Sequence, residues 1–141
     1  MKKICLLILI SFLNLNCHKK ENKNIQKKEN KILESINKSK IIFKSKILDL
    51  GNIKSNDSII SVKYYFTNIS DIPAKIEYVS PDCSCTGFKS PENPILKDSV
   101  GIIELLFNKK NKFGHQKIYA IVKANTEEEL YKLTLKMNIA E

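Results

Sequence analysis

The chain has 141 residues, which is enough for one domain and too few for two, because about 100 residues remain once an N-terminal leader and a linker are set aside. All 24 basic residues are lysines, whereas bidentate contacts with bases and phosphates usually come from arginine. The net charge of +9 is uneven: residues 39–141 hold fifteen lysines against twelve acidic residues. The positive and negative charges of the part that folds are therefore nearly balanced, and we expect no nucleic-acid partner.

Residues 1–16 have the pattern of a secretory signal peptide. Lys2 and Lys3 form a short basic start, and residues 4–13 (ICLLILISFL) are an uninterrupted apolar run of the length of a signal-peptide core. This run is too short to span a membrane as a helix, which needs about 20 apolar residues.

Cys17 follows the apolar run directly, in the sequence Asn14-Leu15-Asn16-Cys17, which resembles the lipobox of bacterial lipoproteins. Asn16 stands where the lipobox usually has a small residue. The resemblance implies that Cys17 carries the lipid (a palmitate-type acyl group) and that the domain is anchored to a membrane of the cell envelope, on its periplasmic or extracellular side. A cleaved soluble form and an uncleaved anchor are the alternatives.

Residues 17–38 are expected to be the lipidated N-terminus and a flexible linker. The segment is rich in lysine and asparagine, and its few apolar residues (Ile25, Ile32, Leu33 and Ile36) are too sparse to anchor a helix. A flexible chain of this length spans about 25 Å. It would act as a spacer, with attraction of its lysines to anionic headgroups as the alternative.

Residues 39–141 change to a period of two, which is typical of half-buried strands. The alternation predicts short strands at 41–43 and 47–50, the latter ending at Gly51, and longer ones over 60–66, 74–78, 103–107, 118–122 and 133–139. A turn is expected at residues 68–71. No helical pattern interrupts this region, so the fold class is all-β, an antiparallel β-sandwich of about seven strands.

Several motifs in this region resemble one bacterial family, domain of unknown function 1573. They are Phe66-Thr67-Asn68-Ile69-Ser70 with Pro73, the segment Asp82-Cys83-Ser84-Cys85-Thr86, and the later Gly101-Ile102-Ile103, Phe107 and Gly114. Ser84 replaces the glycine that the family commonly has between the cysteines. The resemblance covers about residues 41–139 and implies an exported, often lipidated protein with an immunoglobulin-like sandwich, but no settled activity.

Cys83 and Cys85 are the two thiols that would remain after processing, and several interpretations are open. In an extended strand their Cα atoms would lie about 6.6 Å apart, so a disulfide between them requires a tight turn. Such a bond suits thiol redox chemistry, although Asp82 beside the pair disfavours a thiolate. The pair could also be a local structural disulfide or two small buried side chains. A further interpretation is an intermolecular disulfide with a partner protein.

A metal site is another interpretation of the cysteine pair. Cys83 and Cys85 on one face could together bind a soft ion such as copper. A zinc site usually has four protein ligands. The two histidines, His18 and His115, are not at the spacing from the cysteines that zinc motifs show. His115 is expected to be an exposed turn residue.

The leading functional hypothesis is a membrane-tethered, non-catalytic interaction module with an envelope protein as partner. The alternative is soft-metal binding or thiol redox chemistry at residues 83–85. The serines, among them Ser35 and Ser39, belong to no recognisable hydrolase motif. We therefore expect no enzyme, no catalytic residue and no cofactor-binding residue.

Overall fold

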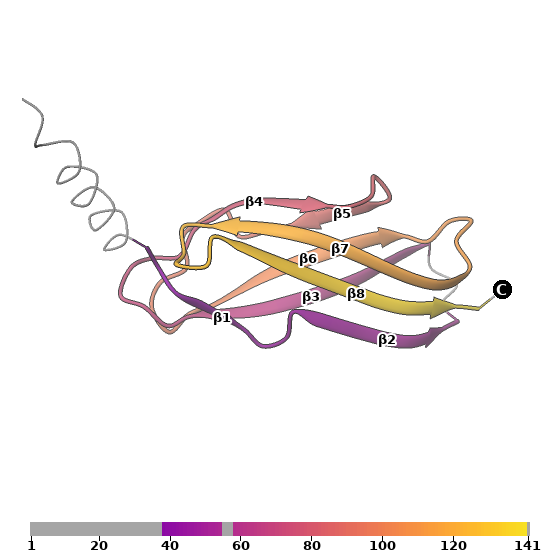
Figure 1. The fold of residues 1–141 in the computed structure, drawn as a ribbon, viewed down its shortest axis with the longest axis horizontal. Coiled ribbons are helices and arrows are strands. Elements are labelled where there is room, and N and C mark those ends of the chain that lie inside the picture. The colour runs from indigo at the N-terminus through magenta and orange to yellow at the C-terminus, as the bar shows by residue number, and fades with distance from the viewer. Residues whose placement is uncertain (1–37, 55–57, 141) are drawn as a thin grey trace, which may run out of the picture. The chain divides into compact units, whose positions relative to one another are not determined.

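The computed structural model describes residues 38–54 and 58–140, and they form two four-stranded β-sheets packed face to face (Figure 1). The first sheet has the order β1-β3-β6-β5 and the second the order β2-β8-β7-β4. The strands are β1 (Ile41–Phe43), β2 (Ile47–Ile53), β3 (Ile59–Asn68), β4 (Ile76–Pro81), β5 (Thr86–Lys89), β6 (Val100–Asn108), β7 (Gly114–Ala124) and β8 (Leu130–Ile139). The all-β sandwich expected from the sequence is confirmed, with eight strands rather than about seven.

The predicted leader, Cys17 and the linker up to residue 37 lie outside the described residues. Within the described ranges, no helix is both long and apolar enough to cross a membrane.

The core consists of the alternate side chains that the period of two predicted. In β3 every second residue from Ile60 to Phe66 is buried, while Ser61, Lys63 and Tyr65 are exposed. The same alternation buries one face of β6, β7 and β8, at Ile103, Leu105, Phe107, Ile118, Ala120, Val122, Leu133, Leu135, Met137 and Ile139. These inner faces meet in one apolar cluster between the two sheets.

One side chain departs from the expected alternation. In the strand predicted over residues 74–78, the period of two places Tyr78 on the same face as Ala74 and Ile76, but Tyr78 is 48% exposed. The pairing of β4 with β7 shifts register between Ile76 and Tyr78, so Val79 is buried in its place. An irregularity of this kind reverses the side-chain direction, and nothing in the residue pattern marks it.

One pair of strands is parallel within the sandwich that the sequence predicted to be antiparallel. β2 pairs with β8 in parallel, whereas the other pairs are antiparallel. The chain crosses between sheets directly after β1: Lys44 N still donates to Tyr65 O in the first sheet, and Lys46 O accepts from Thr134 N in the second. The crossing needs no reversal of direction, and β2 and β8 point to the same end in Figure 1.

Two further details differ from the sequence prediction. β2 does not end at Gly51 but continues to Ile53 through a register shift between Asp49 and Asn52. Gly51 has a φ of 63°, which glycine adopts without strain, and its N–H donates to Asp49 Oδ1 at 2.9 Å. β5 was not predicted, because its four residues, of which three are exposed, show no clear alternation.

Candidate functional site at the Cys83–Cys85 turn

The two cysteines lie in the connection between β4 and β5, where the chain leaves one sheet for the other. β4 is an edge strand of the second sheet and β5 an edge strand of the first. Asp82 N donates to Tyr119 O of β7 at 2.9 Å, and Asn108 N of β6 donates to Cys85 O at 2.8 Å. The turn is thus fastened by backbone hydrogen bonds to both sheets.

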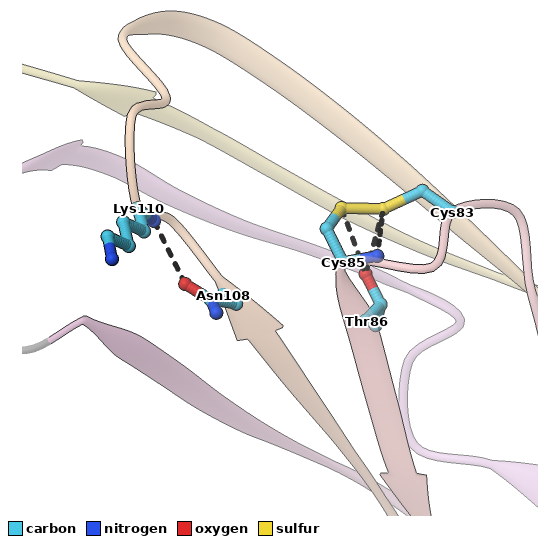
Figure 2. The surroundings of a disulfide bond; sticks show 5 residues. All are labelled: Cys83, Cys85, Thr86, Asn108 and Lys110. Carbon is cyan, nitrogen blue, oxygen red and sulfur yellow. Dashed lines mark hydrogen bonds between the residues drawn. A yellow bond between two sulfur atoms is a disulfide. The ribbon is translucent and has the colours of Figure 1, made fainter.

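Cys83 and Cys85 form a disulfide with each other (Figure 2). Their Cα atoms are 5.2 Å apart, within the range that a disulfide requires. Thr86 N donates to Cys83 O at 3.1 Å, which closes the tight turn that the sequence argument required. In this state neither sulfur is a thiolate, so the soft-metal interpretation applies to the reduced pair alone.

The two sulfur atoms have different surroundings. Cys85 N lies 3.1 Å from Cys83 Sγ and donates to it. The Thr86 hydroxyl is 3.6 Å from Cys83 Sγ and 3.9 Å from Cys85 Sγ. Both cysteines are half-buried, and their neighbours Asp82 and Ser84 are exposed. The disulfide therefore lies in a partly exposed turn.

His115 is not brought to this site. His115 lies near the start of β7, pairs with Asn138 of β8 and is exposed, in agreement with the expectation of an exposed residue, although it belongs to a strand. His18 is outside the described residues. In the part of the chain that the structure describes, no group of three or more His, Cys, Asp or Glu side chains could hold a metal ion.

The comparisons with known proteins place residues 41–139 in a family described as "Protein of unknown function (DUF1573)". The chain belongs to this family. No curated protein matches the chain. The resemblance seen in the motifs is thereby confirmed over the whole sandwich.

Solved structures share the fold of this DUF1573 domain at low sequence identity. A protein of unknown function from Porphyromonas gingivalis W83 matches with a TM-score of 0.63 and 11% identity, over 74% of this chain and 48% of that one. The VesB protease of Vibrio cholerae matches with a TM-score of 0.53 and 8% identity, over 80% of this chain and 35% of that one. The chain thus spans half or less of each neighbour, and these similarities concern the fold alone.

An apolar groove lies on the outer face of the first sheet, and sequence reasoning missed it. Its volume is about 600 Å³, and it is lined by Ile42, Lys44, Tyr65, Thr67, Ile69 and Val100. The pairing of β1, β3 and β6 aligns Ile42, Thr67 and Val100 in one row, and Tyr65 faces Ile102 in the next. The signal in the sequence was an apolar residue, such as Ile42, Tyr65 or Val100, at several of the positions that the strand period assigns to solvent.

The outer face of the second sheet has a different character. Lys132 Nζ lies 3.7 Å from the centre of the Tyr119 ring and Lys117 Nζ 5.4 Å from it. A hydrogen bond with Lys117, followed by the charges of both lysines, lowers the pKa of Tyr119. This face is therefore cationic around an aromatic ring, whereas the first sheet offers apolar side chains.

Proposed function

We propose that this chain is a lipoprotein of the cell envelope, tethered through Cys17, whose β-sandwich is a non-catalytic interaction module. The observation that carries the proposal is the apolar groove on the first sheet. Four of its side chains, Ile42, Tyr65, Ile69 and Val100, are between 41% and 57% exposed. Contiguous exposed apolar surface on a small domain marks an interaction site more often than scattered single residues do.

The groove suits a protein segment with apolar side chains. Its lining is apolar except for Thr67 and Lys44, so a partner would place apolar residues in the groove and an acidic residue opposite Lys44. A surface of this kind needs no active site, which agrees with the absence of a hydrolase motif in the sequence.

The module can be tested with a photo-crosslinking amino acid at Tyr65 in intact cells. We expect one discrete adduct from this position, and we expect Ile42→Asp to abolish it, because a carboxylate in the groove disfavours an apolar occupant. Tyr78 is a matched control, since it is similarly exposed but lies on β4 of the second sheet. Equal adducts from positions 65 and 78, or an adduct unaffected by Ile42→Asp, would refute the module.

The tether is tested separately. Cys17→Ala should release the protein from membrane pellets washed with alkaline carbonate, because the acyl chains hold it there. A variant that stays in the pellet would refute lipid anchoring without affecting the groove.

A second candidate function is thiol redox chemistry at residues 83–85, and the Cys83–Cys85 disulfide favours it. A bond closed by one tight turn and half-exposed to solvent is accessible to an attacking thiolate. Native mass spectrometry of the protein from membranes, with and without alkylation, tests it. Two alkylated thiols in unreduced protein would argue against it, and stoichiometric metal lost on Cys83→Ser would favour the soft-metal alternative.

A further inference from the structure

We propose that Cys83 is the sulfur that exchanges with a partner and that Cys85 is the resolving sulfur. The partner class is a protein of the cell envelope that presents a dithiol or a disulfide. This proposal rests on the thiol redox candidate above and adds to it the roles of the two cysteines and the chemistry of the substrate.

Hydrogen-bond donors are directed at Cys83 more than at Cys85. The Cys85 N–H points to Cys83 Sγ at 3.1 Å, and the Thr86 hydroxyl is nearer to Cys83 Sγ than to Cys85 Sγ, at 3.6 Å against 3.9 Å (Figure 2). Among the described residues, this hydroxyl is the one donor within hydrogen-bond distance of Cys85 Sγ. Donors of this kind stabilise a thiolate, so they favour negative charge on Cys83 in the reduced pair and in the step in which Cys83 is the leaving group.

The packing of the two side chains also supports Cys83 as the sulfur that exchanges with the partner. Cys85 packs against the hydrophobic core of the sandwich, whereas Cys83 is not among the side chains that do so. The carbonyl of Cys85 is also bound to Asn108 N in β6. An attacking group therefore reaches Cys83 first, and Cys85 is the sulfur that leaves. In the reverse direction, with a partner disulfide, Cys85 is the sulfur that attacks Cys83 Sγ and releases the partner.

Exchange through Cys83 balances as two thiol–disulfide steps. A thiolate of the partner dithiol attacks Cys83 Sγ, the Cys83–Cys85 bond breaks, and Cys85 leaves as a thiolate that takes a proton from water. The second partner thiolate then attacks the partner sulfur of the mixed disulfide, and Cys83 leaves as a thiolate. Two electrons pass to the chain, which becomes a dithiol while the partner becomes a disulfide. The donors at Cys83 assist the last step, because a stabilised thiolate is the better leaving group.

The roles can be separated with single-cysteine variants of the full chain in detergent. In Cys85→Ser the remaining Cys83, and in Cys83→Ser the remaining Cys85, is reduced and then mixed with oxidised glutathione at pH 7. We expect the mixed disulfide to form about fivefold faster at Cys83 than at Cys85, because the hydrogen bonds raise its thiolate fraction. Equal rates, or a faster Cys85, would overturn the proposal.

A second variant distinguishes thiolate stabilisation from simple exposure. Thr86→Val, placed in the Cys85→Ser background, keeps the shape of the side chain and removes the hydroxyl. We expect it to slow the reaction of Cys83 about twofold to threefold. Thr134→Val is the matched control, since Thr134 is a similarly buried threonine on β8, and it should leave the rate unchanged. If Thr86→Val also leaves the rate unchanged, the hydrogen-bond assignment is wrong.

An experiment on the wild-type chain distinguishes failure of the redox candidate from failure of the roles assigned to Cys83 and Cys85. It is incubated with a reduced peptide that contains two cysteines, and the mixed disulfide is trapped by acid and located by mass spectrometry. A peptide joined at Cys83 supports the proposal. A peptide joined at Cys85 refutes the assignment but keeps the redox candidate, and a chain whose disulfide does not exchange refutes both.

Discussion

The two ends of β4 are fastened to the rest of the sandwich in different ways. At its start, the connection from β3 is held by the amide of Asn68, which donates to Ile72 O and Ile95 O at 2.9 Å each and accepts from Ser70 N at 3.0 Å and Ser70 Oγ at 2.9 Å. At its end, the connection to β5 is held to both sheets by backbone hydrogen bonds and is closed on itself by the Cys83–Cys85 disulfide. The first connection is held by a network of side-chain hydrogen bonds, whereas the second contains a covalent bond.

The difference lies in exposure as much as in chemistry. Asn68 is fully buried, and its backbone is bound as well, since its N–H donates to Ser99 O and its carbonyl accepts from Asp98 N. The two cysteines are half-buried. A buried, fully paired amide specifies structure, whereas a half-exposed disulfide can be opened without unfolding its surroundings. The first end of β4 is thus built for stability and the second is suited to chemistry.

The largest expected effect is at the first end. Asn68→Ala removes four side-chain hydrogen bonds and leaves two partly buried carbonyls without that partner, so we expect the free energy of unfolding to fall by about 3 kcal/mol. Urea unfolding of the full chain measures it. Asn138→Ala is the control: its amide donates to Asn52 Oδ1 at 2.8 Å in an exposed pair, and its loss should cost less than about 0.5 kcal/mol. Similar losses for the two variants would contradict the structural role of Asn68.

A smaller effect is expected at the second end. The disulfide closes a loop of three residues, and chain-entropy arguments give such a short loop about 1.5 kcal/mol. Adding a reductant should therefore lower the urea midpoint modestly while unfolding stays cooperative. The double variant Cys83→Ala, Cys85→Ala should no longer respond to the reductant. Loss of cooperative unfolding on reduction would mean that the turn is structural and would remove the contrast between the two ends of β4.

The sequence predicted the core well because burial on one face of a strand leaves a period-two signal. Tyr64 and Phe66 were assigned to the core from that signal alone and are each 1% exposed. The register shift beside Tyr78 and the parallel pairing of β2 were not predictable, since both depend on contacts between strands that are distant in the sequence.

The two ends of β4 were predictable to different degrees. Asn68 was identified as a turn residue, but its burial was missed, because an asparagine followed two residues later by Ser70 reads as an ordinary exposed turn. The cysteine spacing identified the candidate site and the need for a tight turn. It could not choose between the bonded and the metal-bound pair, nor distinguish the surroundings of the two sulfurs, since the donors depend on the conformation of the turn.

The smallest expected effect concerns Tyr64, which lies in β3 with Asn68. A substitution there tests whether a buried polar group stabilises the fold only when it has a hydrogen-bond partner. Its hydroxyl has no hydrogen-bond partner among the described residues, and burial raises the pKa of Tyr64 to about 12. The neutral phenol is therefore favoured in the fold, and its contribution to stability is present below pH 10, where the unfolded tyrosine is also neutral. It is lost as the pH rises from about 10 to about 12.

Tyr64→Phe should raise the free energy of unfolding at pH 7 by about 1 kcal/mol, because it removes a buried hydroxyl without a partner. It should also flatten the fall in stability between about pH 10 and pH 12. Tyr131→Phe is the matched control, since the Tyr131 hydroxyl donates to Thr126 Oγ1 at 3.0 Å and its removal should destabilise the fold by about 1 kcal/mol. Urea unfolding at pH 7 and over the alkaline range measures both variants. Two losses of the same sign and size would mean that the pairing of a buried hydroxyl does not decide its effect here, and that the paired polar atoms of Asn68 need not stabilise the connection between β3 and β4.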